Sequence, residues 1–65
     1  MLIIVNRRNV FVQENMHRGQ DILEAAGFEG SEWVVIRLPR DNSVEILLSE
    51  YVQVQDGDRF RVVPT

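Results

Sequence analysis

The stretch Arg18-Gly19-Gln20-Asp21-Ile22-Leu23-Glu24-Ala25-Ala26-Gly27-Phe28 decides the fold, because it is the one convincing helix that the sequence contains. Its apolar residues recur at helical spacing and form a single stripe. That stripe consists of Ile22, Leu23, Ala25 and Ala26. Gly27 is placed to end the helix in a left-handed conformation, and Phe28 can fold back onto the last turn. A helix of about two and a half turns is not stable alone, so other segments must cover the stripe.

Length and composition restrict the class of protein. The chain has 65 residues, 45% of them hydrophobic, a net charge of −3 and no cysteine, which predicts one domain spanning residues 1–65. The negative charge argues against nucleic acid as a partner. No apolar run approaches the roughly 20 residues of a membrane span, and Met1–Val5 lacks the basic region of a signal peptide. We therefore expect a cytoplasmic protein that binds neither nucleic acid nor membranes.

The chain before the helix is predicted to form a β-hairpin. Its strands are residues 2–6 and 10–13, around a turn at residues 6–9. With the simplest connection, the facing pairs are Val5 with Val10 and Ile3 with Val12. The opposite side then carries Leu2, Ile4 and Phe11. A β-bulge would reverse the faces of one strand, so the sequence leaves open whether Phe11 is in the core or on the surface.

The chain after the helix is predicted to form three more strands. They are Trp33–Leu38, Val44–Leu48 and Arg59–Val63. Pro39 ends the first of them, and residues 40–43 and 55–58 have the composition of turns. Residues 49–52 are expected to form a short helical turn with Ser49 as its N-cap. The last strand alternates, with Phe60 and Val62 directed inward and Arg59, Arg61 and Val63 directed outward.

This element order predicts an α+β fold of the β-grasp type. In it, a mixed five-stranded sheet with the order of elements β-β-α-β-β-β carries the helix across one face. The first and last strands lie side by side, parallel, near the middle of the sheet. The strand residues expected against the helix stripe are Ile3, Val5, Ile36, Ile46, Phe60 and Val62.

The same pattern resembles the ubiquitin-like family. Met1-Leu2-Ile3-Ile4-Val5 is similar to the opening strand of ubiquitin, and Leu48-Ser49-Glu50-Tyr51 is similar to the Leu-Ser-Asp-Tyr before its last strand. The bacterial multiubiquitin domains resemble the chain more closely. They share a first strand ending in Val-Asn, a Gly-x-x-Ile-Leu-x-x-Ala-Gly helix and an aromatic residue in the last strand. The corresponding residues here are Val5, Asn6, Gly19, Ile22, Leu23, Ala26, Gly27 and Phe60.

The resemblance implies a bacterial protein modifier, or a domain docked by modification enzymes. Its partners would be an E1-like activating enzyme, an E2-like conjugating enzyme, a JAB-type deubiquitinase-like peptidase and the modified target proteins. A modifier is attached through a flexible C-terminal tail, usually ending in Gly-Gly. This sequence stops at Val63-Pro64-Thr65, so attachment would use Thr65 or residues beyond it. The alternative is a ubiquitin-like interaction module that is not conjugated.

Two groups of residues are candidates for binding a partner protein. The first group shares the sheet face away from the helix and combines apolar residues with arginine. It consists of Arg37, Leu47, Arg59, Arg61 and Val63. The competing interpretation is that these arginines pair with Glu45 and neighbouring acids on a solvated face. The second group is Ile4 and Phe11, with Leu2, if the hairpin has the simple register.

No constellation of residues indicates catalysis or a cofactor, so we expect a protein that is not an enzyme. His17 is the only histidine and metal sites need several ligands. The serines Ser31, Ser43 and Ser49 lie in predicted turns without a partnering base. Asp56 and Asp58 flank Gly57 on a tight turn, where solvated carboxylates are expected. Trp33 is expected to cover the helix end or a sheet edge.

Overall fold

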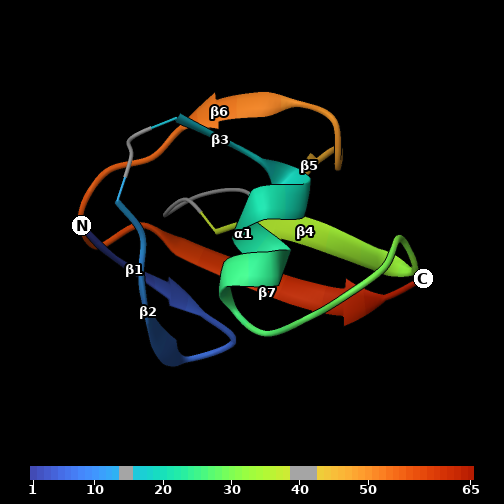
Figure 1. Cartoon of the computed structure of the whole chain (residues 1–65), viewed down its shortest axis with the longest axis horizontal. Helices are drawn as coiled ribbons and strands as arrows, with labels where there is room; N and C mark the ends of the chain where they lie inside the picture. The colour runs from blue at the N-terminus through green and yellow to red at the C-terminus, as the bar shows by residue number, and fades with distance from the viewer. Residues whose placement is uncertain (14–15, 39–42) are drawn as a thin grey trace.

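A mixed five-stranded sheet with one helix across it forms the body of the computed structural model, which describes residues 1–13, 16–38 and 43–65 (Figure 1). The strand order in this sheet is β2-β1-β7-β4-β5. The bounds of these strands are β1 Leu2–Val5, β2 Arg8–Phe11, β7 Arg59–Pro64, β4 Trp33–Arg37 and β5 Val44–Ile46. The α+β class and the mixed sheet agree with the prediction.

The first and last strands are parallel neighbours in the middle of the sheet, as predicted. Ile4 is in register with Arg59, and Val5 with Phe60. The backbone N–H of Ile4 donates to the carbonyl of Asp58 at 2.8 Å. The turn before β7, predicted at residues 55–58, has Gly57 in the left-handed region at a φ of 90°. Its N–H donates to the Leu2 carbonyl, so this turn joins the ends of the two central strands.

Helix α1 (Gly19–Ala25) crosses β7 and β4 in Figure 1 and covers one face of the sheet. It ends as predicted: Gly27 has a φ of 94°, its N–H donates to the Glu24 carbonyl, and the Phe28 N–H donates to the Leu23 carbonyl. These two hydrogen bonds form a Schellman motif. The buried stripe of the helix is narrower than the predicted one, because Ala25 is exposed while Ile22 and Leu23 are fully buried.

The start of α1 lies in close contact with the backbone of the segment after β5. This contact explains why residue 19 is glycine. A Cβ atom at this position would lie 2.5 Å from the Leu47 carbonyl oxygen, a distance that real Cβ contacts do not reach. The Gly19 and Gln20 N–H groups donate to the carbonyls of Glu50 and Leu48, which satisfies donors that a helix start leaves unpaired. Glycine therefore permits both the close approach and the hydrogen bonds.

The hydrophobic core lies between α1 and the sheet. Its buried residues are Ile3, Val5, Val10, Val12, Ile22, Leu23, Val35, Ile46, Val54, Phe60 and Val62. The prediction of Ile36 as a core residue is wrong, because Val35 pairs with Val62 and both are buried. Since successive strand residues point to opposite faces, Ile36 lies on the face away from the helix.

The β1–β2 hairpin has the predicted faces but a different register. Asn6 and Arg7 form a two-residue turn with φ angles of 50° and 67°, which is typical of a type I′ turn. The strand therefore begins at Arg8 rather than Val10, and Ile3 pairs with Val10 instead of Val12. A shift of two residues preserves the faces.

A second, two-stranded sheet lies beside the start of α1, and the sequence does not predict it. It pairs β3 (Met16–Arg18) with β6 (Tyr51–Gln53) in antiparallel register. Residues 51–52 are therefore strand, and the prediction of a helical turn at residues 49–52 is wrong. The strand expected to reach Leu48 ends at Ile46, because the chain turns at Leu48 and Ser49. The predicted end of a strand at Pro39, and residues 40–42 of the predicted turn, lie outside the described residues.

Candidate protein-binding surface

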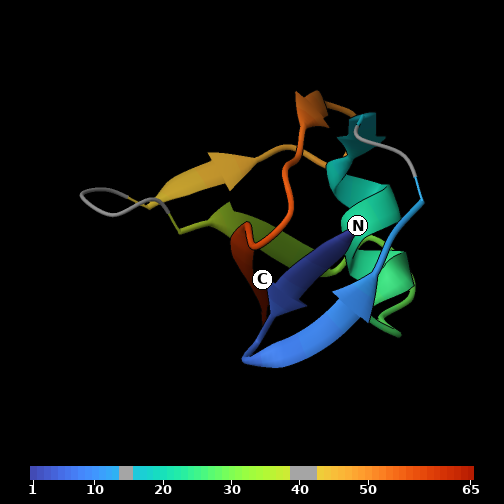
Figure 2. The ribbon, with the colours of Figure 1, turned by 90° about the vertical axis from the view of Figure 1, so that its left-hand side faces the viewer.

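The sheet face away from α1, here called the outer face, combines arginines with apolar side chains. The register places Ile4 beside Arg59, and Ile36 opposite Arg61. Val63 lies opposite Val34 on the same face. Arg59 and Arg61 are exposed, whereas the three aliphatic residues Ile4, Ile36 and Val63 are half-buried. Figure 2 shows α1 on one side of β4 and β7, with the outer face on the side away from the helix.

An open hollow of about 420 Å³ lies over β1, β7 and the hairpin turn. Its apolar lining includes Ile4, Leu38 and Val63, and the arginines at it are Arg7, Arg59 and Arg61. Phe60 and Val62 also line it, although their side chains are buried in the core on the other side of the sheet. The lining of the hollow therefore combines apolar residues with three arginines, a composition that is common at protein interfaces.

The arginines at the hollow are not neutralised by the described part of the chain. The ion pairs among the described residues are Arg18–Asp21 and Arg37–Asp58. Glu45, predicted as a possible partner on a solvated face, is on the outer face opposite Ile36 but forms no ion pair with a described arginine. Positive charge is thus concentrated at this hollow in a protein whose net charge is −3.

Arg37 does not belong to the outer face, and its predicted placement there is wrong. It pairs in register with Phe60 on the helix side of the sheet, and its guanidinium carbon lies 5.7 Å from the centroid of the Phe60 ring. Its Nη2 donates to Asp58 Oδ2, which also accepts from the Gln55 N–H. Arg37 therefore holds the turn before β7 against the core.

Two other predicted partner-binding residues, Phe11 and Leu47, do not line the hollow. Phe11 is 77% exposed in the edge strand β2, opposite Leu2. Of the two positions that the sequence leaves open for Phe11, core or surface, the structure therefore shows the surface position. Leu2, Ile4 and Phe11 lie on the same face of the sheet. Leu47 follows β5 and is also exposed, but it does not line the hollow.

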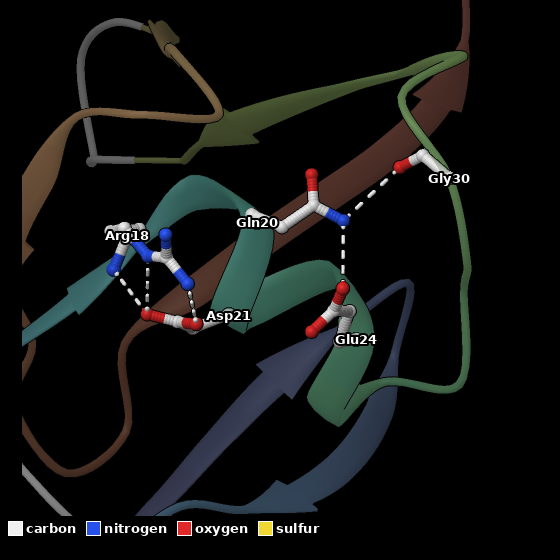
Figure 3. A network of polar contacts seen from close by, with 5 residues as sticks. All are labelled: Arg18, Gln20, Asp21, Glu24 and Gly30. Atoms are coloured by element: carbon white, nitrogen blue, oxygen red, sulfur yellow. Dashed lines mark hydrogen bonds and ion pairs between the residues drawn. The ribbon is translucent and has the colours of Figure 1, made fainter.

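The polar network around α1 has a structural role (Figure 3). Asp21 accepts hydrogen bonds from the Arg18 backbone N–H at 2.9 Å and from the Arg18 guanidinium at 3.1 and 3.3 Å. These bonds hold the pKa of Asp21 below its ordinary value. Gln20 Nε2 donates to Glu24 Oε2 and to the Gly30 carbonyl. The network fixes the start of the helix and ties it to the loop that follows.

The side chains of Asp56 and Trp33 have structural contacts. Asp56 Oδ1 accepts from the Leu2 N–H at 2.6 Å, so this carboxylate anchors the start of β1. Trp33 packs edge-on against Phe28 with ring centroids 4.7 Å apart, and its indole N–H donates to the Glu29 carbonyl. It covers the helix end, as predicted. Among residues 1–13, 16–38 and 43–65, no three His, Asp or Glu side chains are grouped to hold a metal ion.

Sequence reasoning misses Arg7 and Ile36 as outer-face residues. The sequence pattern places Arg7 in a longer turn, whereas the structure has a tight turn at Asn6 and Arg7, and Arg7 lines the hollow. Ile36 belongs to an uninterrupted apolar run, which carries no alternation to show its face. Once Val62 is known to point inward, its pairing with Val35 identifies Ile36 as outward.

Comparisons with known proteins give no family assignment. Searches of protein-family models, of curated proteins and of solved structures find no significant match to this chain. In the described part of the chain, no helix has the length and apolar character to cross a membrane.

Proposed function

We propose that this chain is a ubiquitin-like β-grasp domain that acts as a bacterial protein modifier. The observation that carries the proposal is the sheet order β2-β1-β7-β4-β5, with a parallel central pair and a helix across one face. The sequence motifs that resemble multiubiquitin domains support it further. Gly19 permits the contact with Leu47, Gly27 ends α1, and Asn6 bonds to Val62.

In this function the chemistry belongs to partner enzymes and the domain supplies two surfaces. The outer face is the docking surface for an E1-like activating enzyme, an E2-like enzyme and a JAB-type peptidase. The reacting group is the C-terminal carboxylate, at Thr65 or at residues beyond it. This carboxylate would attack the α-phosphorus of ATP to give an acyl adenylate and pyrophosphate. An enzyme thiolate would then displace AMP, before transfer to an amine of a target protein.

The direct test is activation of the whole gene product by an E1-like enzyme from the same organism. We expect a mass increase corresponding to an adenylate or an enzyme thioester, only when ATP is present. Arg61→Glu should slow the formation of this adduct because it reverses the charge at the hollow. Arg8→Glu is the matched control, since Arg8 pairs with Val5 on the helix side of the sheet. The absence of any adduct with active enzyme would defeat the modifier function.

A second candidate function is an interaction module that is not conjugated. It is favoured by the edge strand β2, which carries Phe11 at 77% exposure and has backbone groups open for strand addition. This function predicts partner binding that disappears with Phe11→Ser and persists when the C-terminal carboxylate is blocked by amidation. Amidation would instead abolish activation of a modifier.

A further inference from the structure

The arginines that line the outer-face hollow indicate which kind of ligand it binds. Arg7, Arg59 and Arg61 line it, and none of them forms an ion pair with a described residue. Guanidinium groups recognise carboxylates through paired hydrogen bonds. Exposed guanidinium groups that form no ion pair with a described residue are therefore suited to carboxylates supplied by another molecule.

The hollow also contains apolar surface that a purely ionic ligand would not use. Ile4 and Val63 are half-buried and line it together with Leu38. Its volume of about 420 Å³ lies within the range of ligand sites in proteins, roughly 300–1,000 Å³. Ile4 of β1 is in register with Arg59 of β7, and Val63 is the next outward residue of β7 after Arg61, so an apolar side chain placed here would have an arginine beside it.

We propose that this hollow binds an acidic peptide segment of the partner protein, in which an aliphatic side chain is flanked by carboxylates. The aliphatic group contacts Ile4 and Val63, and the carboxylates pair with Arg7, Arg59 and Arg61. This inference rests on the proposed function in one respect, that the outer face is a docking surface. The apolar lining of the hollow favours a peptide over nucleic acid, because an aliphatic side chain can occupy that lining and a phosphate backbone cannot.

The test uses a short fluorescein-labelled peptide with a central leucine flanked by glutamates. Fluorescence anisotropy gives its Kd. We expect binding that weakens as the salt concentration rises, and that is at least about tenfold weaker for the same peptide with glutamine in place of glutamate. Replacing the central leucine by serine should also weaken binding. Equal affinity for the glutamate and glutamine peptides would overturn the proposal.

Protein variants locate the binding site. Arg59→Gln and Arg61→Gln should each weaken binding, and the double variant should weaken it by about tenfold or more. Arg8→Gln removes the same charge from the neighbouring strand β2, on the helix side of the sheet, and should change the Kd by less than about twofold. The Trp33 fluorescence, which reports the packing against Phe28, verifies that each variant is folded. An Arg8→Gln effect as large as that of Arg61→Gln would refute the assignment.

Two further outcomes have defined meanings. A labelled single-stranded DNA that binds more tightly than the glutamate peptide would overturn the peptide as the ligand. Activation by the E1-like enzyme is measured separately, so the two hypotheses fail independently. Normal activation without peptide binding would reject this inference alone, and peptide binding without activation would reject the modifier function alone.

Discussion

The side chain of Asn6 forms two hydrogen bonds with the backbone of Val62. Its Nδ2 donates to the Val62 carbonyl at 3.0 Å, and its Oδ1 accepts from the Val62 N–H at 2.9 Å. The amide thus imitates a backbone strand and extends the parallel β1–β7 ladder past the end of β1. Asn6 also begins the hairpin turn at a φ of 50°, a conformation that asparagine tolerates better than most residues.

Replacing this amide should lower the stability of the whole sheet. Asn6→Asp keeps an acceptor for the Val62 N–H, but it loses the donor and places a carboxylate beside the Val62 carbonyl. We expect the free energy of unfolding to fall by about 1–3 kcal/mol, measured by urea denaturation at pH 7. The matched control is Asn9→Asp, an exposed residue of β2, which should change it by less than about 0.5 kcal/mol. Equal effects of both substitutions would show that the added charge is responsible.

Replacing Gly19 by alanine should change the stability in the direction opposite to that usually seen in a helix. In an ordinary helix, replacing glycine by alanine stabilises by about 1 kcal/mol. Here the new Cβ would lie 2.5 Å from the Leu47 carbonyl oxygen, so Gly19→Ala should instead destabilise by about 1–3 kcal/mol. At Gly27 the φ is 94° but a Cβ would meet no atom within 4 Å, and Gly27→Asn should therefore be milder than Gly19→Asn. Thermal unfolding of the three variants would reveal a contrary order.

The ion pair at the start of α1 predicts a pH dependence of stability. Arg18 holds the pKa of Asp21 below its ordinary value, so the folded state binds this proton less tightly than the unfolded state. The stabilisation from Asp21 is therefore present above about pH 4 and is lost as the pH falls through the folded pKa. Asp21→Asn should be less stable than the unmodified chain at pH 7, and this difference should shrink toward pH 2.

Arg18→Gln should reproduce most of that pH dependence, because it removes the guanidinium that contributes most to the lowered pKa of Asp21, while the backbone hydrogen bond from residue 18 remains. If the two side chains act as a pair, the double variant should lose less than the sum of the single losses. Strictly additive losses, or a difference that is constant from pH 7 to pH 2, would contradict the role of the pair.

Sequence reasoning succeeds where one residue type has one structural meaning. Gly27 after an apolar helical stripe indicates a left-handed helix end, and the alternation in Arg59–Val63 indicates which side chains point inward. Both are observed. It fails where the pattern is degenerate. The apolar run Trp33–Leu38 does not show whether Val35 or Ile36 faces the helix. Because the sides alternate along a strand, the prediction that Ile36 faces the helix also places Arg37 on the outer face, whereas Arg37 lies on the helix side.

The remaining differences arise from tertiary contacts that no local pattern contains. Strands β3 and β6 are three residues each, too short for a periodic signal, and they pair segments far apart in the chain. The hairpin turn has no glycine, so its tight form depends on Asn6, whose side chain is held by Val62. That same turn contributes Asn6 and Arg7 to the lining of the hollow.

The absence of lysine from these 65 residues gives a prediction about conjugation. The seven residues that are lysine or arginine are all arginine. An isopeptide bond needs a primary amine, which a guanidinium does not provide. If the domain is a modifier, mass spectrometry of the conjugation reaction should find adducts on target lysines and none on a side chain of this domain. Arg8→Lys keeps the charge at an exposed site away from the outer face, and it should create a domain-to-domain linkage at residue 8. A side-chain isopeptide adduct on the domain with its original sequence would contradict this prediction. If the Arg8→Lys variant accepts no modifier, something other than the missing amine prevents self-conjugation.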